Sequence, residues 1–274
     1  MKIKVNGTSV NIVSPSSDIP QNKTPIIFLH GFTGAASDWD FIMQKINEKY
    51  FPIAVDLPGH GETELSDDIN DYTIKSINTN ISSIIKKLNI SEVVLLGYSM
   101  GGRAALSYAS KHPSVIKALI LESTTAGLKN AEEKKQRMLS DEKLAEKIEK
   151  IGVEKFMQQW LDQPLFESLN RLSQSEYQKI LKKKYANNAR GLANSLRGFG
   201  TGTMRSQWNK LSDLKFPVLL ITGGLDNKYE TIASRMTKLL TVSEHETLPN
   251  TGHNAHLEKP KEFIKLVNNF LEKL

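Results

Sequence analysis

Residues 93–106 read VVLLGYSMGGRAAL and contain a G-x-S-x-G motif centred on Ser99. An apolar, strand-like run precedes the motif, and a helix-forming run follows it. A serine in such a strand–turn–helix is held in a strained conformation at the N-terminus of a helix, which is typical of a nucleophile elbow. The alternative is a purely structural glycine-rich turn. The context favours the elbow, and we predict that Ser99 is a catalytic serine.

The rest of the chain alternates between strand-like and helical patterns. A helix is predicted over residues 77–88, where apolar residues recur on one face, and another from Pro260 to the C-terminus, with Phe263, Val267 and Phe270 facing inward. Nearly continuous apolar runs are typical of strands buried on both faces of a parallel sheet, and they recur at residues 26–29, 53–55, 93–96, 118–121 and 218–221. This alternation predicts an α/β fold with a mostly parallel, doubly wound sheet.

Two segments depart from this alternation. Residues 1–13 form two alternating runs around Asn6-Gly7, which predicts an N-terminal antiparallel hairpin. Residues 124–208 contain no strand-like run and are rich in Lys, Glu and Gln, which predicts an inserted helical cap. We therefore expect a core made of residues 1–123 and 209–274, with a cap at 124–208.

Composition excludes several classes of protein. The 274 residues include no cysteine, which excludes disulfides, thiolate metal sites and cysteine nucleophiles. No apolar run approaches the roughly 18 residues that span a bilayer, and the N-terminus does not resemble a signal peptide. We expect a cytoplasmic protein without membrane insertion. No metal or organic cofactor is indicated, and the sequence does not predict an oligomeric state.

The positive charge is unevenly distributed. The net charge is +6, and residues 171–210 carry nine basic side chains against one acidic side chain, whereas residues 129–155 are nearly balanced. Aromatic residues do not accompany the basic ones as they do in nucleic-acid modules, so we expect no nucleic-acid partner. The basic excess is either a solvated surface or part of a site for a small polyanion.

A catalytic serine requires a base and an acid that orients it. His253 follows the last predicted strand and precedes the last helix, so we favour it as the base over His256. Asp226 follows the strand at 218–221, whereas Asp213 precedes that strand and would lie at the wrong end of the sheet. The order Ser99, Asp226, His253 is that of the α/β-hydrolases. The other histidines are expected to organise loops or to lie outside the site, and they are His30, His60, His112 and His245.

A loop after the strand at 26–29 supplies the remaining catalytic element. Residues 30–34 read HGFTG. Backbone N–H groups of such a loop can donate to a developing oxyanion, and the expected donors are the N–H groups of Phe32 and Met100.

These motifs together resemble the α/β-hydrolase superfamily over nearly the whole chain. A serine at position 99, where an aspartate would be the nucleophile, speaks against the haloalkane dehalogenase and epoxide hydrolase branches. Within the superfamily the chain is similar to the 2-succinyl-6-hydroxy-2,4-cyclohexadiene-1-carboxylate synthase (MenH) family of menaquinone biosynthesis. The segments that carry this resemblance are 30–34, 56–61, 97–103, 127–132, 160–166 and 252–256.

The resemblance implies a lyase that eliminates pyruvate from a substrate with three carboxylates. Such a substrate requires cations, and Arg103 lies one turn into the helix behind Ser99; its alternative role is a salt bridge at the helix start. The cap cations of the family correspond here to Lys134 or Arg137, and to Lys184. Tyr98 and Trp160 are expected to be pocket walls or ordinary core residues.

Two other functions remain open at this point. The same three catalytic residues could act with water in a serine carboxylesterase or a carbon–carbon bond hydrolase. A generic esterase would usually have an apolar acyl pocket, which gives little reason for Arg103 or a basic cap. The third possibility is a non-catalytic α/β-hydrolase shell that binds a ligand or a partner, and the joint presence of serine, acid and histidine disfavours it.

Overall fold

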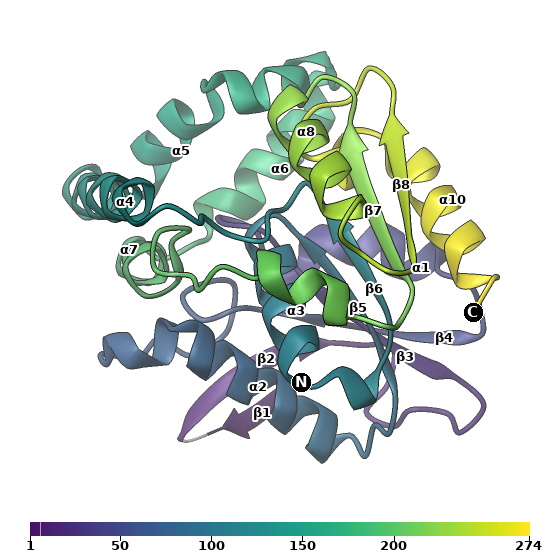
Figure 1. The fold of residues 1–274 in the computed structure, drawn as a ribbon. Helices are drawn as coiled ribbons and strands as arrows, with labels where there is room; N and C mark the ends of the chain where they lie inside the picture. Colours follow the sequence, from purple (N-terminus) through teal and green to yellow (C-terminus); the bar gives the residue numbers. More distant parts are fainter. Residues whose placement is uncertain (6) are drawn as a thin grey trace.

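The computed structural model describes residues 1–5 and 7–274, so Asn6 of the expected Asn6-Gly7 turn lies outside the described residues. An eight-stranded sheet with the order β1-β2-β4-β3-β5-β6-β7-β8 forms the centre of the fold (Figure 1). β1 pairs antiparallel with β2, β2 pairs antiparallel with β4, and the other neighbours are parallel. The predicted sheet and its N-terminal hairpin are confirmed. The strands are β1 (Lys2–Val5), β2 (Thr8–Val13), β3 (Thr24–Leu29), β4 (Tyr50–Val55), β5 (Val93–Tyr98), β6 (Ile116–Glu122), β7 (Val218–Gly223) and β8 (Ser243–Leu248).

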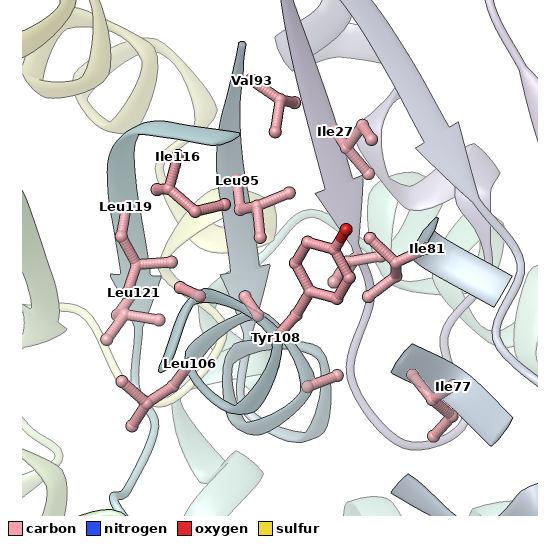
Figure 2. Close-up of a cluster of buried hydrophobic side chains, with 14 of the residues drawn as sticks. Ile27, Ile77, Ile81, Val93, Leu95, Leu106, Tyr108, Ile116, Leu119 and Leu121 are labelled. Carbon is pink, nitrogen blue, oxygen red and sulfur yellow. The ribbon is translucent and has the colours of Figure 1, made fainter. Parts of the chain in front are cut away.

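Helices cover both faces of this sheet. One face packs against α2 (Ile74–Lys87), α3 (Met100–Lys111) and α8 (Asn227–Thr237), and the other against α1 (Asp40–Lys45) and α10 (Pro260–Leu271). Figure 2 shows the first of these layers, where Ile77, Ile81, Leu106 and Tyr108 of the helices meet Val93 and Leu95 of β5. The apolar positions predicted to face inward on α10 are all buried. The short helices are η1 (Ala36–Trp39), η2 (Ile69–Tyr72), η3 (Pro113–Val115), η5 (Trp208–Asp213) and α9 (Ala255–Glu258).

The segment between β6 and β7 is helical and has a small core of its own. Phe156, Leu161, Leu192 and Leu196 are buried together in it, apart from the two layers beside the sheet. The segment lies at the top left of Figure 1 and is called the inserted helices below: α4 (Ala131–Ile151), α5 (Val153–Leu161), η4 (Pro164–Arg171), α6 (Gln174–Tyr185) and α7 (Ala189–Phe199). Within the described residues no helix is both long and apolar enough to cross a bilayer.

The register of the parallel strands aligns their carboxyl ends. Leu29 of β3 lies opposite Gly97 of β5, and Tyr98 of β5 lies opposite Glu122 of β6. β7 and β8 end side by side as well. In an open α/β sheet, ligands bind outside the carboxyl ends of the strands. Side chains on the loops after β3, β5, β7 and β8 therefore meet at one edge of the sheet.

The first turn of α3 approaches β3 so closely that it has no room for a side chain. A Cβ atom on Gly101 would lie 2.5 Å from the carbonyl oxygen of His30, and closer still to that of Leu29. These are backbone atoms of a buried strand end, so they cannot rotate away as a flexible side chain could.

Gly101→Ala should therefore separate α3 from β3. We expect the free energy of unfolding in urea to fall by about 1–3 kcal/mol or more, the range for an overpacked interior. Gly224→Ala is the control, since its Cβ would meet no atom closer than 3.5 Å and should change stability by less than about 0.5 kcal/mol. Equal stability of the two variants would contradict this account of the packing.

Candidate active site

Ser99 lies in a strained turn between β5 and α3. Its backbone has φ 49° and ψ −104°, a left-handed region that side-chain-bearing residues rarely adopt. Two hydrogen bonds hold this conformation: the Ser99 N–H donates to the carbonyl oxygen of Glu122 at 2.9 Å, and the Thr124 hydroxyl donates to the Ser99 carbonyl at 2.7 Å. Such strain is a recognised feature of functional turns. The serine hydroxyl is consequently displayed at the carboxyl edge of the sheet.

Ser99, His253 and Asp226 form one hydrogen-bonded chain. The distance between His253 Nε2 and Ser99 Oγ is 3.1 Å, and that between His253 Nδ1 and Asp226 Oδ2 is 2.6 Å. An ionised carboxylate only accepts hydrogen bonds, so Nδ1 carries the proton and the lone pair of Nε2 faces the serine hydroxyl. This is the orientation that a general base requires. The structure thus brings together the three residues that the sequence singled out.

His256, the other candidate for the base, is engaged elsewhere. Its Nδ1 lies 2.8 Å from Glu122 Oε2, its backbone N–H donates to Glu122 Oε1, and its ring stacks on Trp39 at 4.3 Å between centroids. His245 contacts Thr222 on the next strand at 2.8 Å. His253 therefore differs from His256 and His245 in that it contacts Ser99.

The two expected oxyanion donors lie on neighbouring loops. The Gly34 N–H donates to the Gly31 carbonyl at 3.0 Å, which closes a turn with Phe32 at its second position. Met100 is the first residue of α3, where a backbone N–H has no partner within the helix. Among the described residues, neither N–H donates a hydrogen bond to a protein acceptor. Both are therefore available to a ligand.

His30 holds the first of these loops in its neutral form. Its Nε2 accepts the Leu57 N–H at 3.0 Å, so the proton resides on Nδ1, which donates to the Gly31 carbonyl at 2.7 Å. Burial lowers the pKa of His30 against the opposing effect of Asp56, in agreement with this neutral tautomer. His60 packs against His30, and burial followed by this neighbour lowers its pKa well below the usual value. Both histidines organise loops, as the sequence predicted.

A cavity of about 520 Å³ opens beside Ser99 and His253. This lies within the roughly 300–1,000 Å³ typical of small-molecule sites. The core and the inserted helices both contribute to its walls. These include six aromatic rings (Phe32, Tyr98, Trp160, Phe166, Phe199 and Tyr229), five cationic side chains (Arg103, Arg137, Lys143, Lys147 and Lys228) and one carboxylate (Asp141). In the described part of the chain, His, Asp and Glu side chains form no group of three that could bind a metal ion.

The structure brings four of the six expected binding residues to this cavity. Tyr98, Arg103, Arg137 and Trp160 line it, whereas Lys134 and Lys184 do not. Lys134 lies three residues before Arg137 on α4, which is about 4.5 Å along the helix axis. At that position its backbone carbonyl faces Gly202. Lys184 is buried against the loop after β3, with its Nζ 3.3 Å from the Thr33 hydroxyl.

Arg103 is a buried cation that has no carboxylate partner among the described residues. Its Nη1 donates to the Phe199 carbonyl at 2.9 Å, and its guanidinium lies 4.5 Å from the centre of the Phe199 ring. Burial lowers the pKa of Arg103 to about 10, which leaves the group charged at neutral pH. Within the described residues Arg103 therefore does not form the salt bridge that was its alternative role.

Arg137 by contrast has an anionic partner. Its Nε donates to Asp141 Oδ1 at 2.8 Å, while Oδ2 of that aspartate is buried without a partner in the described chain. Burial raises the pKa of Asp141, and the adjacent Arg137 opposes the shift. The two side chains therefore form a polar pair on the cavity wall.

Sequence reasoning missed three lysines and a tyrosine of the cavity. Lys143 and Lys147 lie on α4, and Lys228 and Tyr229 lie two and three residues after Asp226, in the first turn of α8. The Tyr229 ring packs on the His253 ring at 4.5 Å between centroids. A helical-face signal did exist on α4, because positions 137, 140, 141, 144 and 147 recur at helical spacing and all line the cavity.

The basic excess at residues 171–210 does not supply the cavity cations. None of its nine basic side chains lines the cavity. Several instead join the inserted helices to each other or to the core: Lys183 contacts Ser37 and Asp40, Arg190 contacts Asp67, and Arg197 pairs with Glu142 and Glu149. The cations at the site come mainly from the nearly balanced segment at residues 129–155.

The chain matches known proteins over most of its length. Residues 24–260 match the family model described as the alpha/beta hydrolase fold. A 2-succinyl-6-hydroxy-2,4-cyclohexadiene-1-carboxylate synthase of Klebsiella pneumoniae is 31% identical over 257 residues, which are 92% of this chain and 96% of that protein. A Bacillus subtilis protein provisionally given the same name is 39% identical over 252 residues, 92% of each chain.

Solved structures agree with these relationships. The structure of MenH from S. aureus has a TM-score of 0.90 and 32% sequence identity, and the match covers 96% of this chain and 98% of that one. An esterase from Thermogutta terrifontis has a TM-score of 0.84 at 22% identity, which establishes the shared fold alone; the match covers 100% of this chain and 98% of that one. The chain therefore belongs to the α/β-hydrolase fold family and, within it, to the family of 2-succinyl-6-hydroxy-2,4-cyclohexadiene-1-carboxylate synthases.

Proposed function

We propose that this protein is a lyase of menaquinone biosynthesis. It eliminates pyruvate from 2-succinyl-5-enolpyruvyl-6-hydroxy-3-cyclohexene-1-carboxylate to give 2-succinyl-6-hydroxy-2,4-cyclohexadiene-1-carboxylate. The observation that carries this proposal is the hydrogen-bonded chain of Ser99, His253 and Asp226 beside a cavity with five cationic side chains and one carboxylate. The names of the relatives in the family support it.

Proton abstraction begins the reaction. The Ser99 hydroxyl, polarised by His253 Nε2, removes the proton α to the succinyl ketone, and the proton passes to the imidazole. Asp226 stabilises the imidazolium that results. The ketone oxygen becomes an enolate oxygen, which accepts hydrogen bonds from the Phe32 and Met100 N–H groups.

Elimination then completes the reaction without water. The enolate electrons return to form the conjugated ring diene, and the bond between the ring carbon and the enolpyruvyl oxygen breaks. The leaving group takes up a proton and is released as pyruvate. Because charge develops on the ketone oxygen during the first step, the two backbone donors stabilise the transition state more than the bound substrate.

Cationic residues of the cavity bind the three substrate carboxylates in this proposal. Arg103 is the principal partner, because it is buried beside Ser99 and has no carboxylate of its own among the described residues. Arg137 contributes a second cation, whose charge Asp141 partly offsets. Tyr98 and Trp160 form walls that orient the ring. The inserted segment 124–208 acts as the cap that excludes water.

A hydrolase is the second candidate function. The same chain of serine, histidine and aspartate, with the same pair of oxyanion donors, could form an acyl-enzyme on an ester or cleave a carbon–carbon bond with water. The cavity wall distinguishes the two candidates, because a neutral acyl group would form no ion pair with the buried guanidinium of Arg103. A non-catalytic shell is disfavoured by the oriented imidazole.

Ser99→Ala and His253→Ala should each lower kcat for pyruvate release by on the order of 10⁴-fold or more, since members of such a unit act together. Pyruvate formation is followed with lactate dehydrogenase. Ser110→Ala is the matched control on α3, because its hydroxyl only bonds to the Leu106 carbonyl. Wild-type turnover in either of the first two variants would refute the assignment of the catalytic residues.

Arg103→Ala separates the lyase from the esterase. The variant should lose about 10–100-fold in kcat/KM for the tricarboxylate, the value of a hydrogen bond to a charged group, and less than about threefold for p-nitrophenyl acetate. Arg235→Ala is the control, since Arg235 also lies over an aromatic ring, that of Trp208, but outside the cavity. Equal losses on both substrates would make the role of Arg103 structural.

A further inference from the structure

The turn that carries the Phe32 N–H has a strained residue at its third position. Thr33 has φ 66°, in the left-handed region that β-branched residues rarely adopt. The third position of such a turn usually takes glycine or asparagine. The hydrogen bond from the Gly34 N–H to the Gly31 carbonyl closes the turn, but it does not by itself fix the conformation of Thr33. Another part of the molecule must hold it.

The end of α6 provides these contacts. Asn187 Nδ2 donates to the Thr33 carbonyl at 2.9 Å, and Lys184 Nζ donates to the Thr33 hydroxyl at 3.3 Å. Both donors are buried, with exposed fractions of 9% for Asn187 and 5% for Lys184. The neighbouring Lys183 binds the Ser37 carbonyl in η1 and the Asp40 side chain at the start of α1. The last turn of α6 and Asn187, two residues after it, thus hold the segment that follows β3.

These contacts carry a free-energy cost, because they bury polar groups of Lys184 and Asn187. Burial lowers the pKa of Lys184, with Asp38 as the opposing charge, so the ammonium is held in a desolvated position. The Oδ1 atom of Asn187 is buried without a partner in the described chain. Buried polar groups of this kind normally signal a function for the conformation that they maintain.

The side chain of Phe32 is held by the inserted helices as well. Its ring meets the Trp160 ring at 5.4 Å and the Phe156 ring at 6.4 Å, both on α5 and both edge to face. The loop is therefore fixed from two sides by the same insertion, through its backbone at Thr33 and through its ring at Phe32.

We propose that Asn187 and Lys184 are positioning residues that hold the Thr33 turn in its left-handed conformation and thereby aim the Phe32 N–H at the developing oxyanion. The inserted helices then complete the catalytic machinery in addition to covering it. This inference rests on the proposed function in so far as that function uses the Phe32 donor. It assigns Lys184 to the loop, whereas a direct contact with a substrate carboxylate would require it to line the cavity.

Asn187→Ala removes the contact with the Thr33 carbonyl. Misplacing a reacting group by about 1 Å can cost 10²-fold in rate, so we expect kcat for pyruvate release to fall about tenfold while KM changes less than about twofold. The matched control is Asn188→Ala, since Asn188 caps α7 through the Gly191 N–H and does not contact Thr33. Its kcat and KM should both remain within about twofold of wild type.

Lys184→Met tests the second contact without the risk of unfolding. A methionine keeps the apolar stem and replaces a desolvated ammonium, so the melting temperature should remain unchanged or rise. We expect a fall in kcat of about threefold at constant KM, because only the weaker contact with Thr33 is lost. A rise in KM at constant kcat would instead show that Lys184 binds the substrate, and would overturn the proposal.

A second readout separates this inference from the proposed function. Diethyl p-nitrophenyl phosphate reacts with a serine nucleophile. The Ser99 hydroxyl proton passes to His253 Nε2, the Ser99 oxygen bonds to phosphorus, p-nitrophenolate leaves, and the phosphoryl oxygen occupies the oxyanion site. The rate of p-nitrophenolate release should fall about tenfold in Asn187→Ala and stay within about twofold in Asn188→Ala. Equal rates in the two variants would overturn the positioning role. A wild-type protein that reacts in this assay but releases no pyruvate would refute the lyase function alone.

Discussion

The left-handed backbone of Ser99 is the constraint on which the site depends. A conformation of this kind costs of order 1–3 kcal/mol and persists only where neighbours over-determine it. Here the backbone carbonyl of Glu122 and the Thr124 hydroxyl bond to Ser99 itself. The side chain of the same Glu122, fully buried, accepts both the backbone and the ring N–H of His256, which lies three residues after His253. The end of β6 therefore anchors the serine and the loop of its base at once, so their separation is set by one strand.

The basic residues of the inserted helices form two groups, one that contacts other parts of the protein and one that lines the cavity. Four basic side chains of α6 and α7 bind the core or a neighbouring helix, namely Lys183, Lys184, Arg190 and Arg197. The cavity face of α4 supplies Arg137, Lys143 and Lys147. Lys183 and Arg197 are paired with carboxylates, whereas of these three cavity cations on α4 only Arg137 has a carboxylate partner within the described residues. Net charge along the sequence therefore says little about which segment faces the ligand.

The fold and the central residues were predictable from the sequence because their signals are local. Apolar runs mark the strands, and the residues directly after a strand must lie at its carboxyl end, which places Ser99, Asp226 and His253 at one edge of the sheet. The cap residues were predictable only in part, because the face that a polar helix turns inward depends on its packing partners: Arg137 and Trp160 line the cavity, whereas Lys134 and Lys184 do not. Lys134 and Arg137 are three residues apart on α4, and the end of the cavity falls between them. The position of Lys184 depends on contacts with a loop about 150 residues away in sequence.

The charges of the cavity favour one of the two reactions proposed for Ser99, His253 and Asp226. Arg103 is buried, bonds to one backbone carbonyl and has no anionic partner within the described chain. The Phe199 ring and the charge of Asp141 stabilise this cation in part, but a buried cation without a directly bonded anion is still costly, and removing the partner of a buried pair typically costs about 3–5 kcal/mol. In the proposed function a substrate carboxylate pairs with Arg103, so that the buried cation contributes binding energy for an anion. A neutral ester would leave Arg103 as it is in the free protein and would gain no binding energy from it. In the proposed elimination, a carboxylate of the substrate uses the cation and no water is needed beside Ser99.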